Sequence, residues 1–432
     1  MKISRLAGVA ALLTAGFAQA QTPTIKLDGV LLEFWATQML DNSLRNNATA
    51  SAGASKYYSL DSRFQENTFA VKRAEIYLGG TVTDTLNWAV MFDPNNNNTP
   101  AVPNNVLQDW TLSWTPGNGF NVKAGQFKMP TTYEATLVAA REILFFERNQ
   151  INRKFGDQRD RAIWASYTYG NAKSFMGKIN VAVSNGTTDD GSGGKNNENT
   201  LAGYGNAQKD FMARFEAAFL TSHKAGAYYR EGVTGLKDST MLAGASATAW
   251  PTASVSATQI KDNKDKTTLM GAYYAFNNAT WQFSAEYATG LLGRRNPSLF
   301  AAGTATITPL REHLDQKFTG YVVDGAYKMG NHWITARYDM LNYNSGDNWY
   351  TATNPYTTNV TTGVPTGNDY SPKYTEITVG YNYVFIPAKQ SAGKLKLDYV
   401  MRSKNFLAPS SSTGQTGEQG GNSLVASLMF SY

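Results

Sequence analysis

Residues 281–287, Trp-Gln-Phe-Ser-Ala-Glu-Tyr, alternate between apolar and polar side chains. Because successive side chains of a β-strand point to opposite faces, this period of two predicts a strand with one apolar and one polar face. The same alternation recurs at residues 73–79, 86–93, 211–219 and 395–399, and in each segment the charged side chains share one face. The sequence therefore predicts an all-β protein.

The connections between such segments alternate in length. Sixteen candidate strands begin near Ile25, Phe69, Thr85, Val106, Phe120, Arg161, Phe175, Lys209, His223, Thr267, Ala279, Lys317, Asn331, Tyr374, Gly393 and Ser423. Long stretches at 41–67, 130–160, 232–266, 290–316 and 342–373 interleave with tight turns at 116–119, 170–171, 277–278 and 330–331. The turns contain Gly and Asn, which short hairpins often need for positive φ. Short turns at one end and long loops at the other are typical of outer-membrane barrels.

A water-soluble β-sandwich is the alternative, because its strands also carry one apolar and one polar face. The alternating connections favour the barrel, and an even strand number would place both termini on the periplasmic side. The last strand resembles that of outer-membrane barrels, since Leu424, Ala426, Leu428, Phe430 and Tyr432 share one face and the chain stops on an aromatic residue. We expect a transmembrane antiparallel β-barrel of about 16 strands.

The amino terminus has the pattern of a secretory signal. Lys2 and Arg5 precede an apolar run at residues 6–18, and the run closes with Ala18-Gln19-Ala20. The run is shorter than the roughly 20 residues that a membrane-spanning helix requires. We expect a cleaved signal peptide at 1–20 and a single outer-membrane pore domain at 21–432, in a Gram-negative bacterium.

Composition argues against an enzyme. Cysteine is absent, which removes disulfides, thiolate metal sites and thiol nucleophiles. The three histidines, His223, His313 and His332, lie far apart without metal-ligand spacing, and no G-x-S-x-G segment supplies a serine nucleophile. Aromatic residues make up 12% of the chain and charged residues 17%, and no basic and aromatic module for nucleic acid is present. We expect no catalytic residue, no metal and no cofactor.

Several segments between Lys72 and Tyr169 resemble one known family. They are Lys72-Arg73-Ala74 with Gly79, Gly125-Gln126-Phe127-Lys128 with Pro130 and Glu134, Phe145-Phe146-Glu147-Arg148, and Arg159-Asp160, followed later by Ala336-Arg337-Tyr338-Asp339. In order and spacing they resemble the phosphate-selective porins of the O and P type. The resemblance implies a sixteen-stranded homotrimeric barrel, a third long loop folded into the lumen after Lys128, and basic side chains that attract anions.

The expected inward loop is only moderately basic. Residues 141–161 contain six basic and four acidic side chains, an excess of two, whereas a dedicated phosphate filter should be richer in arginine. Charges in a narrow lumen nevertheless act at close range. The candidate anion-selectivity residues are Arg141, Arg148, Arg153, Lys154, Arg159 and Arg161 in the loop, with Lys123, Lys128, Lys178 and Arg214 on or beside polar strand faces.

Two questions stay open at this point. The loop arginines could instead tie the loop to the wall, Arg148 beside Glu147 and Arg159 beside Asp160, and the acidic residues could form the opposite side of a transverse field. The formal charge of +6 becomes +4 without Lys2 and Arg5, which supports anion preference weakly. We expect passive diffusion of small hydrophilic solutes, anions such as phosphate first, with a general or sugar-type porin and an adhesin or structural anchor as alternatives.

Overall fold

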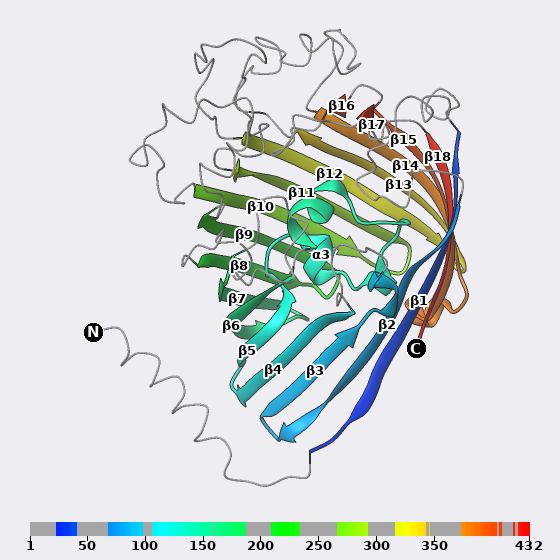
Figure 1. Ribbon diagram of the computed structural model, residues 1–432. Helices are drawn as coiled ribbons and strands as arrows, with labels where there is room; N and C mark the ends of the chain where they lie inside the picture. The colour runs from blue at the N-terminus through cyan, green and yellow to red at the C-terminus, as the bar shows by residue number, and fades with distance from the viewer. Residues whose placement is uncertain are drawn as a thin grey trace, which may run out of the picture.

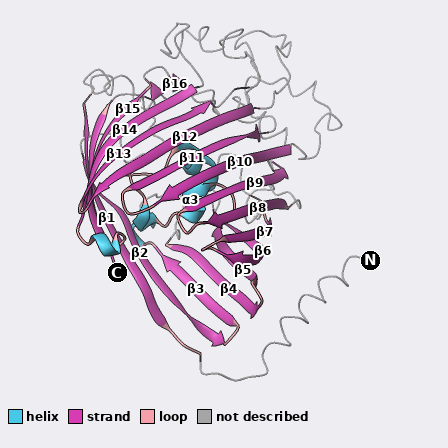
Figure 2. Ribbon diagram, turned by 180° about the vertical axis from the view of Figure 1, so that it is seen from behind, coloured by secondary structure: helices cyan, strands magenta, loops and turns pink. Residues whose placement is uncertain are grey.

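The computed structural model forms a closed barrel of sixteen antiparallel strands (Figures 1 and 2). It describes residues 23–40, 68–97, 106–157, 159–186, 209–233, 266–292, 316–342, 345, 373–403, 406–407, 418–419 and 422–432. The barrel strands are β1 (Lys26–Met39), β2 (Thr68–Thr83), β3 (Leu86–Phe92), β4 (Leu107–Gly117), β5 (Phe120–Lys128), β6 (Arg159–Asn171), β7 (Phe175–Ser184), β8 (Asp210–Phe219), β9 (His223–Val233), β10 (Lys266–Asn277), β11 (Trp281–Leu292), β12 (Gln316–Met329), β13 (His332–Asn342), β14 (Lys373–Val384), β15 (Gly393–Arg402) and β18 (Ser423–Ser431).

The first and last strands close the barrel. Strand β1 pairs with β18 from Leu31 opposite Ser431 to Met39 opposite Ser423, and it pairs with β2 on its other edge. The last residue adds to this seam, because the Val30 N–H donates to the Tyr432 carbonyl at 3.3 Å and the Tyr432 N–H donates back at 3.0 Å. Closure removes the free strand edges that an open sheet would expose.

The sixteen predicted strands are confirmed, and each begins within two residues of its expected position. A two-stranded sheet of β16 (Phe406–Leu407) and β17 (Glu418–Gln419) was not expected. The predicted signal peptide and most of the long loops lie outside the described residues. In the part of the chain that is described, no helix is long and apolar enough to cross a membrane.

The two faces of the wall differ as the alternation predicts. On β15 and β14 the apolar Leu397 and Val379 are 40% and 48% exposed, whereas the charged Lys396 and Asp398 are 1% and 0% exposed. The apolar side chains therefore face outward, and the charged ones are covered inside the barrel.

The connection between β5 and β6 covers these charged inner side chains. Residues 129–157, here called the constriction loop, contain α3 (Tyr133–Leu137) and the short helical turns η4 (Ala140–Glu142) and η5 (Asn152–Gly156). Both ribbon views show α3 within the ring of strands (Figures 1 and 2). The loop is the third connection at the long-loop end of the barrel, after those between β1 and β2 and between β3 and β4.

Turns at the opposite end are short and use left-handed backbone. The hairpin between β4 and β5 has positive φ at Gly117, Asn118 and Gly119, and the hairpin between β12 and β13 has φ 61° at Gly330. Only glycine, or less readily asparagine, adopts this conformation without a steric penalty, which explains the turn composition.

Candidate pore constriction

Side chains of β13–β15 hold the constriction loop through its backbone. Four loop carbonyls accept hydrogen bonds from these strands: Ile143 from Lys394 (3.2 Å), Leu144 from Asn382 (2.7 Å), Phe145 from Lys396 (2.9 Å) and Glu147 from Arg337 (2.7 Å). Two loop N–H groups donate to carboxylates of the same strands at 2.6 Å, Phe146 to Asp398 and Gln150 to Asp339. A segment without regular secondary structure cannot pair its own polar groups, so these side chains satisfy groups that would otherwise be buried unpaired.

Glu147 ties the loop to β2. Its carboxylate forms ion pairs with Lys72 and with Arg73, the second at 3.2 Å, and all three side chains are at least nine-tenths buried. Burial opposes ionisation, but Lys72, Arg73 and Arg148 together hold the pKa of Glu147 well below its ordinary value. Glu147 is therefore a charged anchor of the loop.

Glu376 on β14 is a second anchor. Arg153 of the loop lies 3.3 Å from its carboxylate, Arg337 lies 3.1 Å away and Arg402 lies 3.3 Å away. The Tyr374 hydroxyl also donates to it at 3.1 Å. Three guanidinium groups surround one buried carboxylate, so this cluster is charge-rich but largely committed to internal contacts.

The two ends of the loop meet at Asp157. Its carboxylate pairs with Lys128 at the end of β5 and lies 3.6 Å from Arg148. Burial alone would raise the pKa of Asp157, but Lys128 and Arg148 lower it more. The pKa of Asp157 is therefore below its ordinary value. Nearby, Arg159 pairs with Asp109 at 2.5 Å. Arg148 and Arg159 thus form the ion pairs that the sequence allowed, but with distant partners and not with their neighbours in sequence.

A group of basic side chains lies on the inner wall of β5–β8 around Trp164. The Nζ atoms of Lys123 and Lys178 lie 4.2 Å and 5.8 Å from the Trp164 ring centre, and the Arg214 guanidinium lies 5.8 Å from it. We call Lys123, Lys178 and Arg214 the basic wall. Lys123 and Lys178 are half-buried and have no carboxylate within 4 Å among the described residues, whereas Arg214 pairs with Glu216 at 2.8 Å and donates to Thr131 and Thr136 of the loop.

The remaining candidates are dispersed. Arg141 lies half-buried in η4, and Lys154 lies half-buried in η5. Arg161 is half-buried on β6 and stands opposite Gln126 of β5. The structure therefore brings Lys128 and Arg148 together at Asp157, places Arg153 at Glu376, and gathers Lys123, Lys178 and Arg214 on one wall.

Several buried charges of the constriction were missed as site residues. They are Lys72, Arg73, Arg337, Lys394 and Lys396, with the carboxylates Glu33, Asp339, Glu376 and Asp398, and the half-buried Arg402 belongs to the same set. The sequence does place these residues on the polar faces of alternating strands, and this position is the pattern that could have identified them. What alternation does not show is which polar positions the loop covers.

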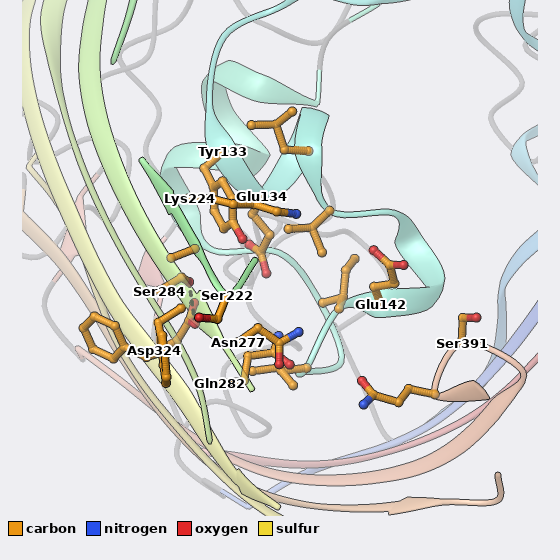
Figure 3. A pocket seen from close by; sticks show the side chains of 18 of the residues that line it. Tyr133, Glu134, Glu142, Ser222, Lys224, Asn277, Gln282, Ser284, Asp324 and Ser391 are labelled. Atoms are coloured by element: carbon orange, nitrogen blue, oxygen red, sulfur yellow. Dashed lines mark hydrogen bonds between the residues drawn. The ribbon is translucent and has the colours of Figure 1, made fainter. Parts of the chain in front are cut away.

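A cavity of about 510 Å³ lies between the constriction loop and β9–β12. Figure 3 shows Tyr133 and Glu134 on its loop side and Ser284 and Asp324 on its strand side. Lys389 and Ser391, in the turn between β14 and β15, also border it. The cavity thus lies toward the short-turn end of the barrel.

Buried carboxylates near this cavity lack cationic partners. Glu134, Glu286 and Asp324 are 6%, 4% and 7% exposed, and no basic nitrogen of the described residues lies within 4 Å of their carboxylates. Instead they accept from neutral donors, Asn149, Tyr228 and Ser284 respectively, at 2.6–2.9 Å. Burial raises the pKa of Glu134 above its ordinary value, although Arg337, the Asn149 N–H and Arg148 act in the opposite direction. In the described part of the chain, no set of three or more His, Asp or Glu residues is placed to hold a metal ion.

Comparison with known proteins agrees with this architecture. A family model described as phosphate-selective porin O and P matches residues 50–405. Among solved structures, OmpT of Vibrio cholerae in its trimer form is similar with 12% identity and a TM-score of 0.50, over 95% of this chain and 100% of that chain. An anion-selective porin from Comamonas acidovorans is similar with 11% identity and a TM-score of 0.50, over the same shares. At these identities the structural likeness concerns the fold, and a comparison with curated proteins gives no match.

Proposed function

The chain belongs to the family of phosphate-selective porins O and P and is an outer-membrane porin channel, and from this premise we propose that it conducts small hydrophilic anions by passive diffusion, phosphate and other oxyanions among them. We further propose that residues 1–20 are removed on export, that the mature barrel is embedded in outer-membrane lipid, and that it assembles as a homotrimer. The described trimer form of OmpT supports the last point by analogy of fold.

The basic wall carries the proposal. Lys123 and Lys178 lie together on one wall, and like Arg141 they have no carboxylate of the described residues within 4 Å. The charges of Arg148, Arg153 and Arg159 are instead opposed by Asp157, Glu376 and Asp109. Because low-dielectric walls focus the field of a charge into a narrow lumen, two lysines outside direct ion pairs can bias the passage of small ions.

The test is the reversal potential of the purified mature protein in planar bilayers under a salt gradient. We expect an anion-signed potential, and we expect the double variant Lys123→Gln, Lys178→Gln to lower the anion-to-cation permeability ratio. The fall should be about sevenfold for each lysine, because a unit charge about 7 Å from the ion favours an anion by about 0.6 kcal/mol in water and disfavours a cation by the same amount. The matched control is the double variant Lys173→Gln, Lys209→Gln, which removes the same total charge away from the basic wall. Lys173 lies in the turn between β6 and β7, and Lys209 directly precedes β8.

Each outcome distinguishes the candidate functions. Equal selectivity of the double variant and the native protein would remove the basic wall from the mechanism. Cation preference, or block of the current by a neutral sugar and not by phosphate, would retain the porin and replace the solute class. A barrel that folds and conducts no current would favour the adhesin or anchor.

A further inference from the structure

The outer face of β10, β12 and β14 repeats one pattern at the long-loop end of the barrel. Each strand has a lysine among its first two residues and a threonine two positions later, namely Lys266 and Thr268, Lys317 and Thr319, and Lys373 and Thr375. Because side chains two positions apart share a face of a strand, each pair presents an ammonium group and a hydroxyl group on the same side. We call Lys266, Lys317 and Lys373 the lysine rim.

The lysine rim points away from the lumen. On β12, Lys317 shares its face with Tyr321 and Val323, which are 37% and 43% exposed, whereas the neighbouring Phe318 is 0% exposed and belongs to the interior. Strands β10 and β14 alternate in the same sense, and all three rim lysines are exposed. The rim is therefore separate from the basic wall, which lies inside the barrel.

The position of the rim along the strands matches the upper edge of an apolar band. Ten residues after each rim lysine, on the same face, an aromatic side chain marks the short-turn end: Phe276, Tyr327 and Tyr383. Ten residues of strand extend about 33 Å, and a tilt of about 35–45° leaves about 25 Å along the membrane normal. The outward apolar band of outer-membrane barrels is about 25 Å tall. The rim thus lies where the chains of outer-leaflet lipid meet their headgroups.

The outer wall is positively charged at this level. Among the outward positions of the described strands β8–β15, as the alternation assigns them, the rim lysines and Glu231 account for all Asp, Glu, Lys and Arg side chains. Glu231 forms an ion pair with Lys266 at 3.0 Å, so three lysines and one carboxylate leave an excess of two positive charges. At the short-turn end of the same strands, the outward side chains are aromatic, aliphatic or histidine. Charge complementarity therefore favours an anionic headgroup in the leaflet at the long-loop end.

We propose that the lysine rim and its threonines bind the phosphate monoesters of a lipid headgroup in the outer leaflet of the outer membrane. A lysine ammonium offers three donors and a threonine hydroxyl offers one, and a phosphate monoester carries a charge of about −1.5 to −2 with strong acceptor oxygens. One strand separates each rim strand from the next, so the lysines stand about 10 Å apart along the wall and meet separate phosphates. The proposal rests on the embedding of the barrel in outer-membrane lipid, and it goes beyond anion conduction because the rim does not line the lumen.

The test uses the purified mature protein in phosphatidylcholine vesicles that contain a trace of a spin-labelled lipid. Electron spin resonance separates lipid held at the protein from bulk lipid, and it gives the association of each probe relative to phosphatidylcholine. The probes are diphosphorylated lipid A, the same lipid without its phosphates, and phosphatidylcholine itself. We expect lipid A to associate at least about fivefold more strongly than phosphatidylcholine, since one lysine near an anionic headgroup contributes a factor of about five. The dephosphorylated lipid should associate like phosphatidylcholine.

Two results of this measurement would count against the proposal in different ways. Equal association of the two forms of lipid A would overturn the binding of phosphate by the rim. Absence of any protein-held phosphatidylcholine would overturn the embedding in lipid on which the rim depends.

The triple variant Lys266→Gln, Lys317→Gln, Lys373→Gln removes the rim charge at exposed positions and leaves the interior intact. We expect its association with lipid A to fall at least about fivefold, toward that of phosphatidylcholine. The triple variant Lys266→Arg, Lys317→Arg, Lys373→Arg keeps the charge and should keep the association. Undiminished association of the glutamine variant would overturn the proposal.

The matched control is Lys173→Gln, Lys224→Gln, Lys389→Gln, which removes three exposed charges near the short-turn end. It should associate with lipid A as the native protein does, because these lysines lie at the opposite end of the strands. A loss equal to that of the rim variant would show that position at the long-loop end does not matter, and would overturn the rim.

Reversal potentials separate lipid binding from anion conduction. In phosphatidylcholine bilayers, the glutamine variant of the rim should keep the native anion-to-cation permeability ratio, because its positions face away from the permeating ions. A changed ratio would contradict the outward position of the rim. The double variant of the basic wall should lower that ratio and leave the association with lipid A unchanged, so either proposal can fail while the other stands.

Discussion

At the scale of single residues, the charge of a side chain in this lumen matters less than the partner it faces. Arg148 and Lys128 share the single carboxylate of Asp157, and Arg153 shares Glu376 with two other arginines, so their charges are held in ion pairs and partly offset. Lys123 and Lys178 lie beside Trp164 without such a carboxylate among the described residues. A count of basic residues therefore ranks the candidates differently from the structure.

Asp157→Asn tests this balance directly. The substitution removes the charge that opposes Lys128 and Arg148, so we expect the anion-to-cation permeability ratio to rise by about sevenfold, by the same Coulomb estimate. The measurement is the reversal potential in planar bilayers. Asp84→Asn, in the turn between β2 and β3, is the control for a change in net charge alone. An unchanged ratio in Asp157→Asn would mean that permeating ions do not sense Lys128 and Arg148.

At the scale of elements, the constriction loop is stable because the barrel supplies its hydrogen bonds. Its helical pieces are only three to five residues long, too short to be stable alone. Lysine, arginine and asparagine side chains from β13–β15 bind its carbonyls, and its own Phe145 and Phe146 are fully buried against the barrel wall. We infer that the loop and the inner wall unfold together.

Arg337→Met removes one of these supports. Arg337 is 2% exposed, pairs with Glu376 and donates to the Glu147 carbonyl, so its loss leaves buried groups without a partner. Breaking a buried pair typically costs about 3–5 kcal/mol, and Arg153 and Arg402 remain at Glu376, so we expect a free energy of unfolding lower by about 3 kcal/mol. Denaturant unfolding in lipid vesicles measures it.

The control for Arg337→Met is Lys266→Met, which breaks an exposed pair with Glu231 at 3.0 Å. Exposed ion pairs contribute about 0–1 kcal/mol, so this variant should remain close to the native protein. Similar losses for the two variants would show that the loop contacts of Arg337 contribute little to stability.

At the scale of the whole molecule, the barrel separates two solvents. Its outer face exposes apolar side chains on every side, and its inner face carries the charges. An alternating strand in water would need a second sheet to cover its apolar face. The seam between β1 and β18 leaves no free edge, and we propose that the lipid bilayer covers the apolar outer face of the closed barrel.

Val379→Arg tests the outward orientation of β14. Val379 lies mid-strand and is 48% exposed, so the substitution places a charge in lipid. We expect the free energy of unfolding from bilayers to fall by about 2–4 kcal/mol, the cost of arginine near the midplane of a barrel. Val379→Met, which is long but apolar, should change it little. A native-like stability for the arginine variant would place Val379 outside the hydrocarbon region.

The sequence by itself determined the strands, their faces and the order of turns and loops. These are local properties, since a period of two in residues 281–287 or 395–399 and a glycine at a turn act within a few residues. The basic positions Lys123, Lys178 and Arg214 were found in the same way, because they lie on the polar faces of alternating strands. Their orientation followed from the alternation, but their proximity to one another did not.

Only the tertiary structure decided which charges are paired. The Phe146 N–H meets Asp398 across 252 positions of sequence, Arg153 meets Glu376 across 223, and Arg159 meets Asp109 and not the adjacent Asp160. Such partners are set by where the constriction loop crosses the closed barrel, and no local pattern encodes that position. Electrostatic selectivity depends on distances of a few ångströms between these groups, which only the folded chain defines.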